Sequence, residues 1–309
     1  MTSPSLTDLV AAELAERVDP RGGAMAAAIA ALYPGAARAV LFYGSCLRTA
    51  DLDGQMLDFY LIVSDYEAAY GKGWLARANR LVPPNVFPFE YQGLAAKYAV
   101  LSEPDFERLN GPDTLSVSVW ARFAQPSRLA WTADDEAARA AIAAIARAAP
   151  TLLEAAAPVM GGGTVDPLML WRRAFALTYS AELRAERKTR AASVVDADPA
   201  RYLRFTGPAL KRTDIGSLAN GELSLKPVGA EGRRRAERLW AKRRRAGKAL
   251  SVLRLAKASG TFAGGADYIA WKINRHAGTD IVLKPWQRRW PLIGAVTLLP
   301  RLLKRGAIR

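Results

Sequence analysis

Cysteine and histidine are almost absent from this chain of 309 residues, which contains one of each. Disulfide-stabilised folds need cysteine pairs, and zinc centres need several Cys or His ligands, so the sequence excludes both classes. An apolar signal core is also missing from the first 20 residues, which predicts a cytosolic protein. The apolar stretch 290–300 contains two prolines. It reaches only about half of the roughly 20 residues that a membrane span needs, so we expect no such span.

Acidic residues are scarce in the last quarter of the chain. From Ala230 onward there are 20 basic and 4 acidic residues, whereas the preceding 229 residues contain 24 basic and 25 acidic ones. A neutral body with a basic end predicts a polyanionic partner. Residues 284–305 combine cations with Trp and Leu, as is typical of proteins at lipid headgroups. Binding to a nucleic-acid backbone requires cations but gains nothing from exposed leucines. We therefore expect an anionic membrane surface and not nucleic acid.

Apolar runs and helical periodicity predict an α/β or α+β first domain. Residues 39–43 and 56–63 are typical of strands that are covered on both faces, and 86–91 and 97–101 indicate two more strands, joined by a turn at Gln92 and Gly93. Pro88 favours an edge position for the strand 86–91. Helices are expected over residues 7–17, 23–33, 66–81 and 134–149.

The second half of the sequence favours helices. Three consecutive glycines at 161–163 suggest a hinge, after which Asp166 and Pro167 are typical of the cap and first residue of a helix that continues to residue 190. Residues 232–257 predict a basic helix. We therefore expect three parts: a first domain over 1–160, a mainly helical second domain over 161–260 and a basic amphipathic, membrane-binding tail over 261–309.

The residues best suited to chemistry follow the first buried strand. Gly44 permits close backbone approach, so that amide groups and the Ser45 hydroxyl can hold triphosphate oxygens. Asp58, at the head of the next strand, can hold Mg²⁺ that bridges the phosphates. This spacing resembles the nucleotidyltransferase fold of the polymerase-beta type, although Tyr60 stands where a second carboxylate is usual. An ordinary strand-turn-strand would also explain the glycine and the serine, but Asp58 in an apolar strand needs a cation or donors.

A more specific resemblance comes from five segments in order: residues 43–45, 56–59, 97–102, 179–184 and 259–265. Together they resemble the mitochondrial-type phosphatidate cytidylyltransferases, the translocator assembly and maintenance family of CDP-diacylglycerol synthases. The similarity spans residues 39–265. It implies a peripheral enzyme of phospholipid biosynthesis at the cytoplasmic side of the membrane. Its reaction would convert CTP and phosphatidic acid to CDP-diacylglycerol and diphosphate, with Mg²⁺ as cofactor.

The resemblance also implies roles for particular residues. Nucleotide binding falls to Tyr43, Gly44, Ser45 and Lys188, catalysis to Asp58, Lys97, Glu182 and Arg184, and metal binding to Asp58 and Asp65. Glu90 and Glu182 are alternatives for the second metal ligand.

Simpler roles remain open for the same positions. Asp65 can be a helix cap, Lys97 a strand-start cation, and the charges near residue 182 solvated helix pairs. Ala181 and Glu182 replace the Gly and Asp of the family motif, and Ala99 and Cys46 replace glycines. Two other functions also stay open: nucleotidyl transfer to RNA or another phosphate acceptor, and noncatalytic lipid binding.

Overall fold

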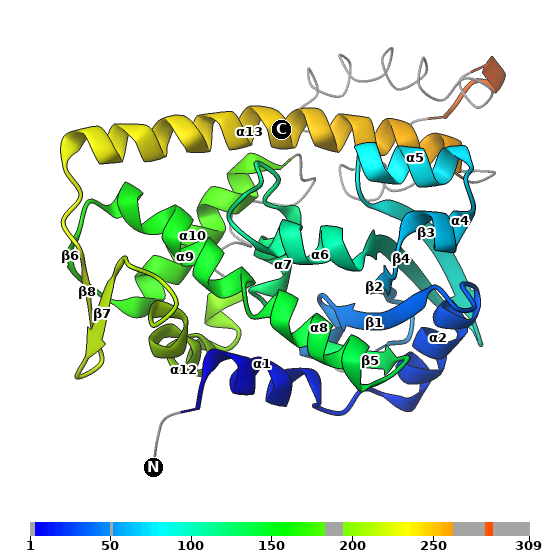
Figure 1. Ribbon diagram of the computed structural model, residues 1–309, viewed down its shortest axis with the longest axis horizontal. Helices are drawn as coiled ribbons and strands as arrows, with labels where there is room; N and C mark the ends of the chain where they lie inside the picture. Colours follow the sequence, from blue (N-terminus) through cyan, green and yellow to red (C-terminus); the bar gives the residue numbers. More distant parts are fainter. Residues whose placement is uncertain (1–3, 50–51, 183–193, 262–281, 287–309) are drawn as a thin grey trace.

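The chain was analysed as a computed structural model that describes residues 4–49, 52–182, 194–261 and 282–286 (Figure 1). The expected α/β class is confirmed, with a mixed sheet and helices in the first half and mainly helices in the second. The large sheet contains β1 (Ala37–Tyr43), β2 (Met56–Val63), β3 (Asn85–Tyr91), β4 (Leu94–Ser102) and β5 (Ser127–Thr132). The helices of this half are α1 (Leu6–Leu14), α2 (Pro20–Ala31), α3 (Cys46–Thr49), α4 (Tyr66–Tyr70), α5 (Trp74–Leu81), α6 (Glu103–Asn110), α7 (Ser118–Phe123), α8 (Asp135–Ile145) and α9 (Ala148–Met160).

The five strands lie in the order β3-β4-β2-β1-β5. β2 and β4 are parallel, and the other neighbouring pairs are antiparallel. β1 and β2 are interior strands as expected, and the strand that contains Pro88 is at the edge. β5 was not predicted, because its half-buried side chains give no continuous apolar run.

The sheet separates two hydrophobic clusters because successive side chains of a strand point to opposite faces. Leu57, Phe59 and Leu61 of β2 pack into one cluster together with residues of α2. Tyr60 and Ile62 belong to the other, which also contains α7, α8, α9, α10 and α12. That second cluster joins the sheet to the helical half of the chain.

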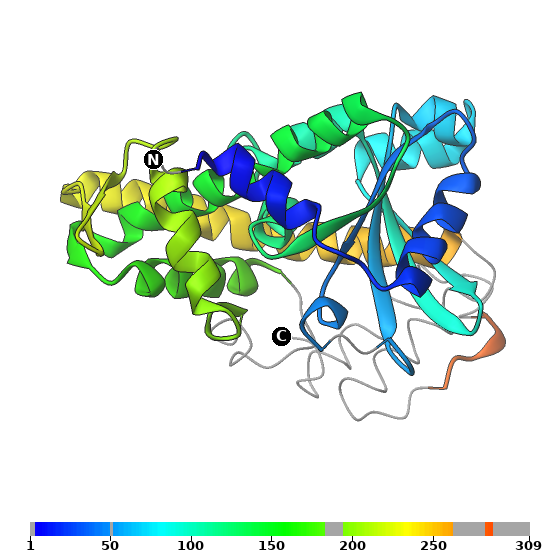
Figure 2. The ribbon, with the colours of Figure 1, turned by 90° about the horizontal axis from the view of Figure 1, so that it is seen from below.

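The second half comprises α10 (Pro167–Ala181), α12 (Pro199–Leu210), α13 (Ala230–Thr261) and a small sheet of β6 (Gly163–Val165), β8 (Glu222–Leu225) and β7 (Gly216–Ala219). Asp166 caps α10 and Pro167 is its first residue, as the sequence indicates. Figures 1 and 2 show α13 running along both halves of the molecule. Trp240 on α13 donates from Nε1 to the Ala155 carbonyl oxygen of α9 at 2.8 Å. The division at residue 160 stays a prediction, and the basic tail is largely outside the described residues.

Two of the predicted helices are interrupted. The helix expected over 66–81 is wrong as one element, because Gly71 at φ 67° ends α4 and α5 begins after Gly73. The helix over 134–149 ends at Ile145, and α9 begins at Ala148. Among the described residues, 135–160 are long and apolar enough to span a membrane, but 67% of the most apolar window is buried inside the protein.

Candidate functional site

Three of the predicted site residues lie in one row across the sheet. Tyr43 at the end of β1 pairs with Asp58 of β2, and Asp58 pairs with Lys97 of β4. Residues paired in this way point to the same face, here the face of the second cluster. Asp58 Oδ1 is 2.6 Å from Lys97 Nζ, and the two side chains are 19% and 28% exposed. Within the described part of the chain this buried oxygen accepts no hydrogen bond of good geometry, so the ion pair compensates its charge.

Gly44 occupies the turn that leaves β1, and the turn requires glycine for two reasons. Its φ of 101° is a conformation that residues with a Cβ rarely adopt. A Cβ at this position would also lie 2.9 Å from Asp58 Oδ2. The turn therefore presses against the Asp58 carboxylate, and the partly exposed Ser45 follows directly. Cys46 is buried in the first cluster and packs there.

Arg122 of α7 covers this row from the helical side of the sheet. Its Nη1 donates to the Tyr43 hydroxyl at 3.1 Å, and its guanidinium carbon lies 4.8 Å from the Tyr43 ring centroid and 5.9 Å from that of Tyr60. Burial opposes the charge, but Tyr43, Tyr60, Glu182 and Asp58 favour it, so the pKa of Arg122 is raised overall. Its buried Nε has no hydrogen-bond partner among the described residues. This arginine therefore keeps a donor that an anionic ligand could use.

Sequence reasoning missed Arg122. A signal was present, since this arginine stands between buried residues of a short helix that contains Val119, Trp120 and Phe123. A cation inside such an apolar segment must find partners when the segment is buried.

Two further charged residues approach from the second half of the chain. Glu182 follows the last residue of α10, where α13 crosses so closely that a Cβ on Gly247 would collide with the Ala181 carbonyl oxygen. About two turns further along α13, Arg254 donates from Nη1 to Ser118 Oγ at 2.7 Å and from Nη2 to Ser116 Oγ at 3.3 Å. Burial lowers the pKa of Arg254, Glu182 opposes this change and Arg122 adds to it. The predicted Glu182 is thus brought to the same site, together with an arginine that was not predicted.

Asp65 is not brought to Asp58, and its predicted role as the partner metal ligand is wrong. Asp58 lies near the start of β2, and Asp65 follows the far end of that strand. A strand rises about 3.3 Å per residue, so the two carboxylates are roughly 20 Å apart. Asp65 instead caps α4, with Oδ1 accepting from the amides of Glu67 at 2.7 Å and Ala68 at 2.8 Å. This is the simpler role that the sequence left open.

The remaining predicted residues divide into two sets. Glu90 is exposed on the edge strand β3 and is separated from Asp58 by β4. Arg184 and Lys188 lie outside the described residues, as does His276. Among the described residues no group of three or more His, Cys, Asp or Glu side chains could hold a metal ion by itself. A divalent cation at Asp58 would therefore need further oxygen ligands from outside this set of side chains.

No protein-family signature and no curated protein matches this chain. One solved structure similar to it is the crystal structure of a nucleotidyltransferase-like protein from Exiguobacterium sibiricum 255-15, with a TM-score of 0.27 and 10% sequence identity over 93% of this chain and 91% of that one. A TM-score this low leaves the function of the chain to be inferred from its own residues.

Proposed function

We propose that this chain is a nucleotidyltransferase that transfers the cytidylyl group of CTP to phosphatidic acid. The main support is one arrangement: a positive-φ glycine turn packed against Asp58, which is paired with Lys97 on the next strand. Such a turn offers backbone amides to phosphate oxygens while the neighbouring strands supply a carboxylate and a cation. The identity of the nucleotide and of the lipid rests on the sequence resemblance described above.

The proposed reaction joins two anionic reactants. An oxygen of the lipid phosphate forms a bond to the α-phosphorus of CTP, and the bond from that phosphorus to the oxygen bridging to the β-phosphate breaks. Diphosphate leaves with the bonding electron pair. No side-chain nucleophile is needed, so catalysis consists of positioning and charge compensation. Lys97 and Arg122 are the cations suited to this task, because both lie beside Asp58 on the same face of the sheet.

Mg²⁺ is part of the proposal, and Asp58 is the residue that would hold it, while Gly44 and Ser45 would bind the triphosphate. Asp58 fits because its partly exposed carboxylate has Oδ2 against the Gly44 turn, while Oδ1 forms the ion pair with Lys97. Mg²⁺ is commonly bound by one or two carboxylates together with substrate phosphates, which suits a site with a single acid. When bound, the ion would supply positive charge to the triphosphate. Tyr60, in the place of a second acid, is buried against Tyr43 and Phe123.

The test measures CDP-diacylglycerol formed from labelled CTP and phosphatidic acid vesicles in the presence of Mg²⁺. We expect lipid product from the parent, and a loss of roughly a thousandfold or more in Asp58→Asn, because the charge that holds the cation is removed. The matched control is Asp214→Asn, since Asp214 is 94% exposed and pairs with Lys226 on the surface. Its activity should equal that of the parent.

Other outcomes would contradict the proposal. Equal turnover in Asp58→Asn would remove Asp58 from the site. If RNA is added and the label appears in RNA but not in lipid, the acceptor is RNA and not phosphatidic acid. Vesicle binding without any nucleotidyl transfer would indicate a noncatalytic lipid-binding protein. ATP, GTP and UTP in parallel reactions test the choice of base.

A peripheral position on the cytoplasmic side of an anionic membrane belongs to the same proposal. The support is the composition of the C-terminal tail, where cations alternate with Trp and Leu. Deletion of residues 278–309 should weaken salt-sensitive vesicle binding, and undiminished binding and turnover would contradict this role of the tail.

A further inference from the structure

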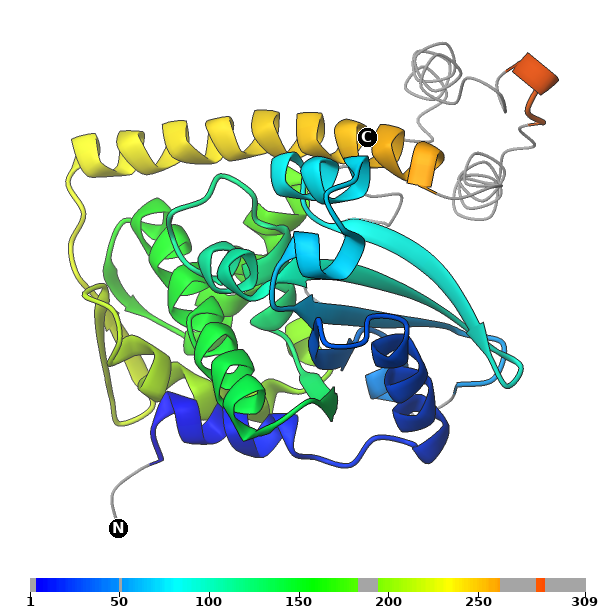
Figure 3. The ribbon, with the colours of Figure 1, turned by 45° about the vertical axis from the view of Figure 1, so that its right-hand side comes forward.

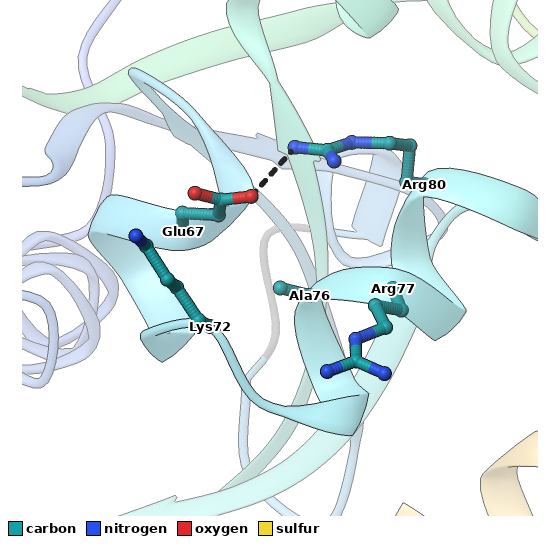
Figure 4. A pocket seen from close by; sticks show the side chains of 5 residues that line it. All are labelled: Glu67, Lys72, Ala76, Arg77 and Arg80. Carbon is teal, nitrogen blue, oxygen red and sulfur yellow. Dashed lines mark hydrogen bonds and ion pairs between the residues drawn. The ribbon is translucent and has the colours of Figure 1, made fainter.

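A basic hollow lies between α4 and α5, away from the row of site residues. Its volume is about 430 Å³, and it is lined by Glu67, Lys72, Ala76, Arg77 and Arg80 (Figure 4). Arg80 Nη2 pairs with Glu67 Oε1 at 3.4 Å, which neutralises the acidic residue of the set. Lys72 and Arg77 are exposed and form no ion pair within the described part of the chain. The hollow therefore retains two positive charges for an external anion.

Helix α5, which carries Arg77 and Arg80, also exposes large apolar side chains. Trp74 is 53% exposed, and Leu81, at 79%, is the most exposed large apolar side chain that the structure describes. The two residues are seven positions apart on α5, and Arg77 lies between them at the third position. Positions with this spacing share one face of a helix. One face of α5 thus presents tryptophan, arginine and leucine to the outside.

We propose that α5, together with Lys72, is a docking surface for an anionic lipid bilayer. Trp74 and Leu81 would enter the interfacial zone, where amphipathic rings and aliphatic side chains are stabilised, while Lys72 and Arg77 would contact headgroup phosphates. Each cation near such a surface contributes favourably to binding. A nucleic acid would use the cations but not the exposed Leu81, so the lipid surface suits the whole face. This inference goes beyond the proposed transfer reaction and does not depend on it.

The position of α5 supports this occupant. Arg254 of α13 donates from Nε to the Pro83 carbonyl oxygen at 2.8 Å, and Lys257 donates to the carbonyl oxygens of Val82 and Pro84. These carbonyls belong to the loop that directly follows α5, and Figures 1 and 3 show α5 beside the end of α13. α13 ends at Thr261, and the 48 residues beyond it contain 9 basic and 2 acidic residues. The basic tail therefore begins next to the proposed surface, and both would face the same membrane.

The first experiment removes the apolar part of the surface. The full chain is sedimented with vesicles of phosphatidylcholine with and without phosphatidylglycerol, in the absence of CTP. For Trp74→Ser combined with Leu81→Ser, we expect binding to the anionic vesicles to fall about tenfold or more, since two interfacial side chains are lost. The matched control is Met169→Ser with Leu203→Ser, whose side chains are 52% and 46% exposed on α10 and α12. It should bind as the parent does.

The second experiment removes the charge. Lys72→Glu with Arg77→Glu should reduce the preference for phosphatidylglycerol and the steepness of the salt dependence, which the basic tail also supports, whereas Arg234→Glu with Arg235→Glu on the exposed start of α13 should have a smaller effect. Inorganic phosphate is included as a competitor. If phosphate alone binds the parent at this hollow and the charge variant loses that binding with unchanged vesicle affinity, the surface binds free anions and the proposal is overturned.

A third measurement reports on Trp74 itself, so that vesicle binding through the tail cannot conceal the result. The chain contains 8 tryptophans, and the difference between the parent and Trp74→Phe isolates the emission of one. With brominated lipids in anionic vesicles, this difference signal should be strongly quenched. Absence of quenching while the protein is bound would overturn the proposal, whatever the outcome for CDP-diacylglycerol synthesis. Quenching without any nucleotidyl transfer would instead retain the surface and reject the proposed activity.

Discussion

Arg122 and Arg77 are both arginines on short helices of the first half of the chain, yet their surroundings are opposite. Arg122 is held by the Tyr43 hydroxyl, stacks on two aromatic rings and lies within the influence of Asp58 and Glu182. Arg77 is exposed between two exposed apolar residues and has no ion-pair partner in the described part of the chain. A cation fixed by its neighbours suits one ligand of defined geometry, whereas a free cation among apolar side chains suits a surface whose headgroups move. The two regions should therefore respond differently to substitution.

Gly44→Ala should separate the two regions most strongly. The new Cβ meets Asp58 Oδ2 and the backbone is held at a positive φ, so both the turn and the carboxylate must shift. We expect nucleotidyl transfer to fall by about a hundredfold or more and the free energy of unfolding to fall by about 1–3 kcal/mol. Binding to anionic vesicles should not change. The measurements are turnover, denaturant unfolding and vesicle sedimentation.

Gly35→Ala is the matched control for this variant. Gly35 also has a positive φ, 73°, but a Cβ there would meet no atom within 4 Å. It should share the loss of stability and retain turnover. Equal turnover losses in both variants would mean that strain, and not contact with Asp58, explains the effect.

Arg122→Lys should give the next largest effect. Lysine keeps the charge but cannot donate in a planar fork or stack on Tyr43 and Tyr60 as guanidinium does. We expect turnover to fall by about ten- to a hundredfold, with unchanged vesicle binding. Arg139→Lys, on the exposed side of α8, is the control and should behave as the parent. If the Arg122 variant lost vesicle binding instead, the division between a chemical site and a docking surface would be wrong.

Asp58 could be singled out from its place in an apolar strand, and Tyr43 and Lys97 from the family resemblance, but their alignment in one row is shown by the structure. Once three strands are neighbours, their register aligns these positions. Arg122 and Arg254 could not be found in this way. Their partners are 79 and more than 130 residues away in sequence, and only the packing of α7 and α13 brings them together.

The wrong predictions have local causes. Asp65 is expected as the second metal ligand beside Asp58, but the extended strand between them places the two residues far apart. The sequence predicts a single helix over 66–81 that includes Gly71 and Gly73, because the apolar periodicity continues on both sides of them. The break matters, since it creates the hollow and lets α5 present its own face.

Lys257 lies where the two regions meet, and its titration gives the smallest predicted effect. Burial and, to a smaller extent, the nearby charge of Arg254 lower its pKa to about 7. Above that pH the folded chain has lost a proton that the unfolded chain keeps, so the free energy of unfolding should rise between about pH 7 and pH 9, by at most about 1.4 kcal/mol per pH unit. Below the folded pKa both states are protonated and this slope disappears. At higher pH the buried tyrosines Tyr33 and Tyr98, whose pKa values are raised by burial, oppose the slope.

Lys257→Met should remove this rise, while Lys248→Met, at an exposed position of the same helix, should retain it. Denaturant unfolding across the pH range measures the difference. The neutral amine still has two hydrogens for the carbonyls of Val82 and Pro84, so the contact between α13 and the loop after α5 should survive deprotonation. Parallel curves for the parent and Lys257→Met would place Lys257 with the solvated cations of α5. If the free energy of unfolding of Lys257→Met no longer rises with pH, Lys257 belongs with the buried charges around Arg122. The boundary between the two regions then lies between Lys257 and Arg77.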